Sequence, residues 1–295
     1  MTLVRNFDAS TARRGMLAQL ASLPGYPALI WHHRYMVQNF FRRDLLSRVN
    51  GSMLGVGWIL LQPIFLFVVY YFVFGVIFGD PKEPVADKQL FAIYLFSGVV
   101  AWQSLIEAVS TSCVLIVENG NLVKKVAFPS EALFIHVAAV AAIIYLVGAV
   151  VCFLTGWSLG VIQPGWLLAA LPLVMAVQFV MTVGLGMILA NLNVFVRDIS
   201  QIWRIVGMAW MFVTPVFWKP SFLEKGLSAE AVHWIANSNP AYSLVMAHRL
   251  ALGGPPSILG DFWSQLGVAA TWALGLFLFG YCMFMSRKHK YADLI

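Results

Sequence analysis

The sequence predicts an all-α protein that crosses a membrane several times. Hydrophobic residues make up 60% of the 295 residues, charged residues only 11%, and the mean hydropathy is +0.80, whereas a soluble domain carries about 25% charged residues. The apolar residues also gather in runs close to the length of about 20 residues that a helix needs to cross a bilayer. We therefore expect a polytopic membrane protein with six transmembrane helices, an amino-terminal amphipathic interfacial helix and short re-entrant outer helices.

Five of the expected spans are clear and one is short. The short one reaches the length of a span only with help from the residues before it. The six spans lie at about residues 53–79, 89–117, 133–155, 166–191, 203–218 and 262–286. We expect a flexible cytoplasmic leader at 1–28, a single membrane domain over 29–290 and a cytoplasmic tail at 291–295, because no other stretch is long enough for a second folded domain.

Lysine and arginine are distributed unevenly between the two sides of these spans. Six spans place both termini on one side, which holds fourteen of the 19 Lys and Arg residues, whereas five lie on the other side. Because positive residues accumulate in cytoplasmic segments, both termini are predicted to be cytoplasmic. The net charge of +6 follows from this bias, so no nucleic-acid partner is expected.

Residues 29–50 are expected to form a helix that does not span. Val37, Phe41 and Leu45 recur at four-residue spacing, with basic residues among them. This pattern is typical of an amphipathic helix that lies in the membrane interface and contacts lipids. A basic flank that only fixes the topology fits the sequence equally well.

Two short apolar stretches lie at about residues 227–252, before the last span. Asn239 and Pro240 stand between them, and these residue types end one helix and start another. Neither stretch is long enough to cross, and half-spanning backbone is tolerated only where protein or a wet cavity satisfies its polar groups. The stretches indicate two re-entrant helices on the outer side, with an interfacial outer loop as the alternative.

Charged residues reappear between the fourth and fifth spans, in the stretch NLNVFVRDISQIW at 191–203. Wound as a helix, this stretch has one apolar and one polar face. Asn193 can cap its start, and Asp198 complements the helix dipole. The stretch is either a capped turn that joins two spans or a docking helix for a cytoplasmic partner.

Four features carry a resemblance to a known family. They are the amphipathic amino-terminal helix, NVFVRDI at 193–199, TPVFW at 214–218, and NP at 239–240 followed by HR at 248–249. Over almost its whole length the chain resembles the membrane subunit of ABC-2 type exporters, in the branch that exports polysaccharides such as O-antigen, capsule and teichoic acid. His248 departs from the family pattern, in which an aromatic residue more often precedes the arginine.

The resemblance implies a homodimeric permease in the inner membrane of a bacterium, working with two copies of a separate ATP-hydrolysing subunit. The chain has no G-x-x-x-x-G-K-[ST] phosphate loop, so we expect no enzyme and no cofactor here, with ATP and Mg on the partner. Cytoplasmic connections insert into the ATPase in this family, which implies coupling helices at about 118–129 and 193–202. The expected coupling residues are Asn193, Arg197, Asp198, Gln201, Glu118, Lys124 and Lys125.

The translocation path is expected to be rich in aromatic residues, because flat rings can pack on sugar faces without tight specificity. For about half of the aromatic residues, lipid-facing packing or interfacial anchoring is an equally good explanation. Glu107 is the one acid well inside a span, where an isolated charge is costly, so it is expected to line the path or to have a structural role. The path candidates are Phe67, Tyr70, Tyr71, Phe74, Trp102, Glu107, Trp210, Phe217 and Trp218.

The substrate that the resemblance implies is a lipid-linked polysaccharide similar to O-antigen. Arg42, Arg43 and Lys124 lie where they can meet the lipid pyrophosphate, although each also fits a topology signal. An ABC-2 permease for a small drug or lipid is the alternative. A membrane glycan-processing enzyme is a remote one, because it needs paired acids or a metal cluster. The 3 cysteines lie in apolar runs without metal-binding spacing, and no metal site is expected.

Overall fold

Five helices in the described part of the chain are long and apolar enough to cross a membrane. The computed structural model describes residues 16–48, 50–55, 57–77, 84–125, 128–221, 226, 228–254 and 260–295. These residues contain no strand, so the predicted all-α membrane fold is confirmed. The candidate spans are Gly57–Phe74, Asp87–Glu118, Ser130–Ser158, Trp166–Phe195 and Phe262–Leu294, and each falls on a predicted span.

Each candidate span contains one main helix. These helices are α4 (Gly57–Tyr70), continued by the π-helix η2 (Tyr71–Ile77), α5 (Val85–Glu118), α7 (Leu133–Ser158), α8 (Leu171–Phe195) and α14 (Phe262–Arg287). Short 3-10 turns flank three of them: η3 (Ser130–Ala132), η4 (Trp166–Ala170) and η5 (Lys288–Lys290), the last leading into α15 (Tyr291–Leu294). Helix α5 is central, because it contacts α4, α7, α8 and also the helices α9 and α12 described below.

The fifth predicted span corresponds to α9 (Ile199–Val213), which has only 15 residues. At 1.5 Å per residue it is about 22 Å long, less than the roughly 30 Å of a hydrocarbon core. It begins beside the end of α8, because the Ser200 N–H donates to Asn193. The segment after it is bonded to Arg249 at the other end of the bundle. Helix α9 and the segment after it therefore connect the two ends of the bundle, and the sixth span stays a prediction.

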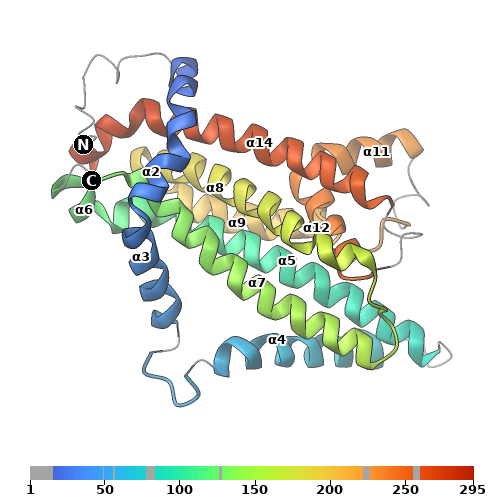
Figure 1. Cartoon of the computed structure of the whole chain (residues 1–295). Coiled ribbons are helices and arrows are strands. Elements are labelled where there is room, and N and C mark those ends of the chain that lie inside the picture. The colour runs from blue at the N-terminus through green and yellow to red at the C-terminus, as the bar shows by residue number, and fades with distance from the viewer. Residues whose placement is uncertain are drawn as a thin grey trace.

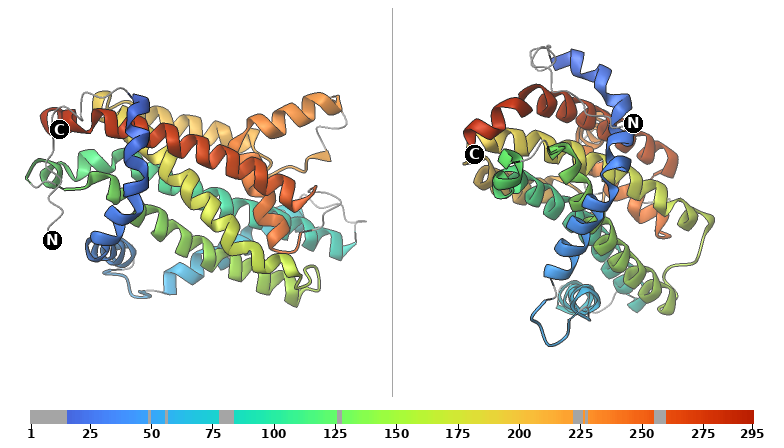
Figure 2. Two further views of the ribbon diagram at one scale, coloured as in Figure 1. Left: turned by 45° about the horizontal axis from the view of Figure 1, so that its top comes forward. Right: turned by 60° about the vertical axis from the view of Figure 1, so that its left-hand side comes forward.

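The amino-terminal helices run across the bundle rather than along it. They are η1 (Met16–Gly25), α2 (Tyr26–His32) and α3 (Arg34–Ser47), and Figures 1 and 2 show them in blue across the end that also holds α6 (Gly120–Lys125) and α15. This end is called the inner end, and the opposite one the outer end. A helix in this orientation is what an interfacial position requires.

The structure differs from the expected flexible leader in residues 16–28. These residues are helical, and η1 contacts α14. The hydroxyl groups of Ser22 and Tyr281 lie 3.0 Å apart. Tyr26 is 7% exposed and donates to the carbonyl oxygen of Glu131 at 3.0 Å. The anchoring residues come from distant parts of the sequence, which a local pattern cannot reveal, and residues 1–15 lie outside the described ones.

A close contact between α8 and α14 depends on two glycines. A Cβ atom added to Gly184 would lie 2.5 Å from the backbone nitrogen of Phe277, and one added to Gly280 would lie 2.4 Å from the carbonyl oxygen of Gly184. Small residues of this kind allow membrane helices to approach backbone to backbone. No side chain can move aside to make room here, because the neighbouring atoms belong to the main chain.

The two short apolar stretches before the last span form α11 (Ala229–Ser238) and α12 (Pro240–Ala251) at the outer end (Figure 1). The side-chain oxygen of Asn239 accepts the N–H of Ala241 at 3.1 Å and so caps α12, and Pro240 occupies its first turn. Every residue from Ala241 to Ala251 is buried. Helix α12 thus has the protein surroundings that a half-spanning helix requires.

Arg249 holds α12 to two other segments at the outer end. Its side chain donates to the carbonyl oxygens of Tyr94, Pro215 and Val216 at 3.1, 2.5 and 2.8 Å. The guanidinium also lies 3.6 Å from the centre of the Tyr94 ring. The arginine is 2% exposed, so these acceptors supply the polar partners that its buried charge needs. The TPVFW and HR features of the sequence therefore meet in one buried joint.

Gly184→Ala is expected to destabilise the folded protein by about 1–3 kcal/mol, because the added methyl group forces α8 and α14 apart. Gly275→Ala is the control, since no atom lies within 4 Å of a Cβ added at that position of α14. The midpoint of thermal unfolding of the purified protein in detergent measures both effects. Equal midpoints for the two variants would contradict the close contact.

Candidate functional site

The turn between α8 and α9 lies at the inner end of the bundle. Helix α8 continues to Phe195, the backbone is extended at Val196, and α9 starts at Ile199. The predicted coupling helix at 193–202 is therefore corrected to the end of α8, a short turn and the start of α9. The sequence could not show this break, because apolar residues occur at helical spacing on both sides of it.

Asn193 lies inside this turn rather than on its surface. It is 3% exposed, and its side-chain oxygen accepts the N–H of Ser200 at 3.2 Å. It therefore caps α9, and not a helix that begins at 193. Asp198 stands at the N-cap position of α9 but makes no capping bond. Arg197, Asp198 and Gln201 are exposed, so a partner can reach them.

The last turns of the chain support the α8–α9 turn. The ring of Phe195 lies 5.4 Å from the guanidinium of Arg287 and 6.5 Å from the ring of Tyr291. Tyr291 is fully buried and donates to the side-chain oxygen of Asn191 at 2.9 Å. The C-terminal residues thus pack beneath the exposed turn and support it.

The other predicted coupling segment, residues 118–129, contains α6. Glu118 is the last residue of α5 and is exposed. Lys124 is also exposed, and its amino group donates to the carbonyl oxygen of Ile295. Lys125 is the last residue of α6, but its side chain lies outside the described part of the chain. Figure 1 shows α6 at the inner end, close to the C-terminus.

One face of the bundle is apolar and largely exposed in the part of the chain that the structure describes. No residue of α4 is buried, and Phe65 is 67% exposed. On α9 only Trp203 and Gly207 are buried, whereas Ile205 is 72% exposed. Both helices contact α5. The surface formed by α4, α9 and the exposed side of α5 is called the open face.

Helix α5 contributes a polar stripe to the open face. Gln103, Glu107, Ser110 and Thr111 recur at helical spacing, and each keeps an exposed or partly exposed side chain. The indole N–H of Trp203 donates to the Ser110 hydroxyl at 3.1 Å, which places the stripe beside α9. Polar side chains on the exposed side of a span indicate a watery path or a protein partner, because lipid cannot satisfy them.

Glu107 forms an ion pair with Arg48, the residue that follows α3. Its depth follows from the antiparallel helix α7, because the Ser104 hydroxyl donates to the carbonyl oxygen of Ala141 at 3.0 Å. Glu107 is thus level with about residue 138, roughly 8 Å along the axis from the start of α7. The acid therefore lies closer to the inner end than its place in the apolar run indicates, and Arg48 balances its charge.

The aromatic path candidates form two groups. Tyr70 and Phe217 have ring centres 6.3 Å apart and join segments far apart in the sequence at the outer end. This outer group comprises Phe67, Tyr70, Tyr71, Phe74, Phe217 and Trp218. Trp102 and Trp210 form the second group, with ring centres 5.3 Å apart. Trp102 is only 2% exposed, so it packs in the core and does not face an open path in this chain.

Arg42 and Arg43 are exposed on α3 at the inner end. The guanidinium of Arg43 lies 4.7 Å from the centre of the Phe40 ring, and this ring stacks on His136 of α7 at 5.3 Å. Helix α3 is thus fixed on the bundle through its apolar side. Arg42 and Arg43 remain exposed and can meet anionic groups near the surface.

The sequence did not predict two ion pairs that the structure shows here. They join Arg48 to Glu107 and Lys288 to Glu131, and the partners are 59 and 157 residues apart. The only signal was an acid within or beside an apolar run, because pairing over such distances leaves no local pattern. Among the described residues no group of His, Cys, Asp and Glu could hold a metal ion.

Comparisons with known proteins show which family the chain resembles. Residues 35–252 match the family described as ABC-2 type transporter. A Myxococcus xanthus protein named O-antigen export system permease protein RfbA is 25% identical over 273 residues, which are 90% of this chain and 97% of that protein. Two Klebsiella pneumoniae proteins of the same name are each 22% identical, over 86% of this chain and 92% of their own length.

Asn193→Ala is expected to destabilise the start of α9 by about 1 kcal/mol, the usual cost of a lost N-cap. Hydrogen exchange of the amides of residues 199–201 should then become about fivefold faster. Asp198→Ala is the control and should show a smaller rise, because Asp198 makes no capping bond. Faster exchange in Asp198→Ala than in Asn193→Ala would assign the cap to the aspartate and contradict this geometry.

Proposed function

Since the chain belongs to the ABC-2 type transporter family, we propose that it is the membrane-spanning permease subunit of an ATP-driven polysaccharide exporter. Its substrate is a lipid-linked, O-antigen-like glycan that moves from the cytoplasm across the inner membrane of a bacterium. The names of the relatives support this substrate. The observation that carries the proposal is the open face, where a polar stripe on α5 lies beside the apolar helices α4 and α9.

Two copies of the chain form the conduit. The inside of one copy is filled by large buried side chains such as Trp102 and Tyr145, which leave no room for a sugar chain. The apolar surfaces of α4 and α9 suit burial against a second copy, because removal of such a surface from lipid permits close packing between helices. The polar stripe then faces a shared interior, with Glu107 near its inner mouth.

Aromatic rings supply the grip on the glycan. Phe67, Tyr70, Tyr71, Phe74, Phe217 and Trp218 gather at the outer end, and Trp210 lies in the last turn of α9, where its indole N–H donates to Asn239. Flat apolar rings pack against sugar faces without fixing one residue of the polymer in place. This suits a chain that must slide. Trp102 contributes indirectly, because it packs edge-on against Trp210.

ATP and Mg bind to two copies of a separate subunit, because this chain carries no phosphate loop. The α8–α9 turn and α6 are the docking turns. The exposed side chains of Arg197, Asp198 and Gln201 contact the ATPase from the first, and Asn193 keeps its shape from inside. Lys124 and Lys125 contact the ATPase from α6, and Glu118 contacts it from the adjoining end of α5.

The lipid pyrophosphate approaches the inner end of the bundle. Arg42 and Arg43 on α3 and Lys124 on α6 present positive charge there, and phosphate groups are attracted by such charge. Both termini are cytoplasmic in this proposal. The distribution of Lys and Arg supports this orientation.

Deletion of the gene is expected to remove the surface polysaccharide and to leave the lipid-linked glycan inside the cell. The wild-type gene should restore export, whereas Arg197→Ala should not, although the variant inserts and assembles normally. An exposed charged side chain contributes at most about 1 kcal/mol to stability, so the loss is one of docking. Fractionation of polysaccharide measures export, and immunoblots of membranes measure the insertion of the variant.

Arg34→Ala is the matched control for this experiment, because Arg34 is an exposed arginine of α3 away from the docking turns. It should restore export fully. Unchanged surface polysaccharide in the deletion strain would overturn the substrate. Normal export by Arg197→Ala would overturn the docking role of the turn.

Cysteines placed on the open face are expected to crosslink two copies in native membranes. The test positions are Phe65 on α4 and Ile205 on α9, which are 67% and 72% exposed. Val150 on α7, 47% exposed, is the control, and the 3 native cysteines are replaced first. Dimers on denaturing gels should form only with the test positions. Crosslinks at Val150 alone would show that the copies meet through another face.

A further inference from the structure

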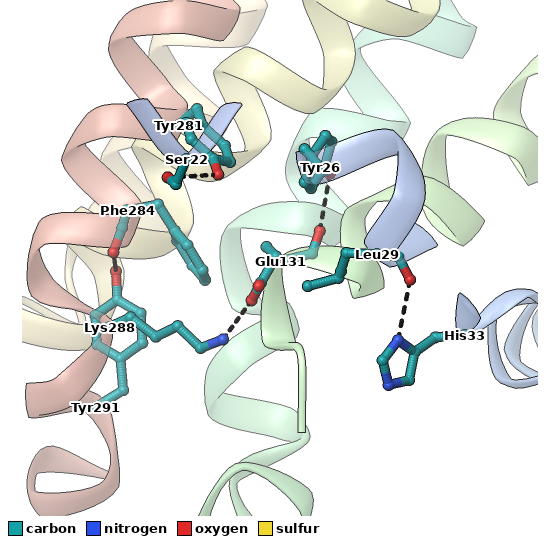
Figure 3. Close-up of polar contacts among 9 residues, drawn as sticks. All are labelled: Ser22, Tyr26, Leu29, His33, Glu131, Tyr281, Phe284, Lys288 and Tyr291. Carbon is teal, nitrogen blue, oxygen red and sulfur yellow. Dashed lines mark hydrogen bonds and ion pairs between the residues drawn. The ribbon is translucent and has the colours of Figure 1, made fainter. Parts of the chain in front are cut away.

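Buried polar contacts join three distant segments at the inner end (Figure 3). Lys288, directly after α14, forms an ion pair with Glu131 before α7, and the two side chains are only 13% and 4% exposed. The backbone carbonyl of Glu131 accepts the hydroxyl of Tyr26 at 3.0 Å. One residue therefore connects the C-terminal segment, the segment after α6 and the amino-terminal helix α2.

Helix α2 and the residues before it are fixed to α14 by further contacts. The hydroxyl groups of Ser22 and Tyr281 lie 3.0 Å apart, as Figure 3 shows. The ring of Tyr26 meets that of Tyr281 edge-on at 5.4 Å. Burial raises the pKa of the Tyr26 hydroxyl well above its usual value, and the nearby charge of Glu131 raises it further. The hydroxyl therefore remains a hydrogen-bond donor at physiological pH.

The same C-terminal segment touches both docking turns. Arg287 and Tyr291 enclose Phe195 at the start of the α8–α9 turn, at 5.4 and 6.5 Å. Lys124 of α6 donates to the carbonyl oxygen of Ile295. Residues 287–295 thus contact every part of the inner end that the proposed ATPase would push.

The amino-terminal helices lead from this junction to the open face. Helix α3 follows α2 across the bundle (Figure 2), and the next residue, Arg48, pairs with Glu107 on the polar stripe of α5. The contacts therefore form a continuous series from the docking turns, through Lys288 and Glu131, to the inner mouth of the open face.

We propose that residues 287–295 act as a brace that makes the two docking turns and the interfacial helices α2 and α3 move as one unit. The ion pair of Lys288 and Glu131 is the link to α2. Movement of the ATPase at either turn then shifts Arg48 and changes access to the inner mouth. The inference rests on the proposed function for the source of the movement, whereas the brace itself does not depend on the substrate.

Lys288 and Glu131 are positioning residues, because they act through α2 and α3 and not on glycan or nucleotide. Removal of one partner leaves an uncompensated buried charge, which is strongly destabilising for the contact, whereas an exchange of the two charges keeps the pair. The ion pair holds Glu131 where its backbone carbonyl accepts the hydroxyl of Tyr26, so loss of the pair loosens this contact to α2 as well. If the ion pair is what matters, the single variants should lose the link to α2 and the charge-exchanged variant should recover it. If only one of the two side chains matters, the charge-exchanged variant should not recover.

The first test is hydrogen exchange in the purified complex of permease and ATPase, without glycan. Amides of residues 19–32 should exchange at least about tenfold faster in Lys288→Gln and in Glu131→Gln, because the buried pair is broken. The double variant Glu131→Lys with Lys288→Glu should return close to the wild-type rate. Lys290→Gln is the control, since Lys290 is exposed on the same short helix, and it should not change.

The second test compares ATP hydrolysis with export in cells and vesicles. The single variants should hydrolyse ATP but export about tenfold less glycan for each ATP consumed, and the charge-exchanged variant should recover most of the ratio. Unchanged exchange at residues 19–32 in both single variants would overturn the brace, whatever the substrate is. A normal ratio of export to ATP in both single variants would overturn its role in transport.

A milder variant keeps the proposal testable if the charge variants accumulate poorly. Tyr26→Phe removes only the hydroxyl that bonds Glu131, and Tyr35→Phe on the exposed part of α3 is its control. Exchange of residues 19–32 should rise severalfold in the first and stay constant in the second. Equal exchange in the two variants would contradict the brace. These exchange rates do not depend on the glycan, so they test the brace even if the proposed substrate is wrong.

Discussion

The constraint on which the rest of the structure depends is that every charged or hydrogen-bonding group inside a bilayer needs a partner, because hydrocarbon provides none. Only 11% of the residues are charged, and those near the bundle interior are paired with distant segments. Arg249 binds three carbonyl oxygens at the outer end. Arg48 meets Glu107, and Lys288 meets Glu131, towards the inner end. Each pairing fixes helices at one level that apolar packing alone would leave free to slide.

The sequence predicted what depends on local pattern. Apolar run length placed the long helices, and Asn239 with Pro240 marked the start of α12, because a cap is decided by a few neighbouring residues. It could not predict features that depend on distant partners. The helical period runs across the break at Val196, so the turn was expected as a helix. The segment before residue 28 looked like a leader because its anchors, Glu131 and Tyr281, come much later in the chain.

The candidate site shows the same division. Composition predicted an aromatic translocation path, and the structure brings Tyr70 and Phe217 together at the outer end, but their role in transport stays a prediction. The same composition gave no means to separate Trp102, which is buried in the core, from exposed rings. Exposure is a property of the packed helices and not of the residue type. Helix α5 illustrates this best, because one side of it holds the bundle together and the other carries the polar stripe.

No residue of α4 is buried within its own copy, so in the proposed dimer a whole span becomes covered only when a second copy arrives. Each conduit then consists of two copies of this chain. If the proposed dimer forms, a copy that pairs but cannot respond to the ATPase would disable its wild-type partner as well, and with equal amounts of both forms only about a quarter of the dimers would be intact. In such a dimer, alleles that spare assembly would interfere with the wild type, whereas alleles that prevent folding would not.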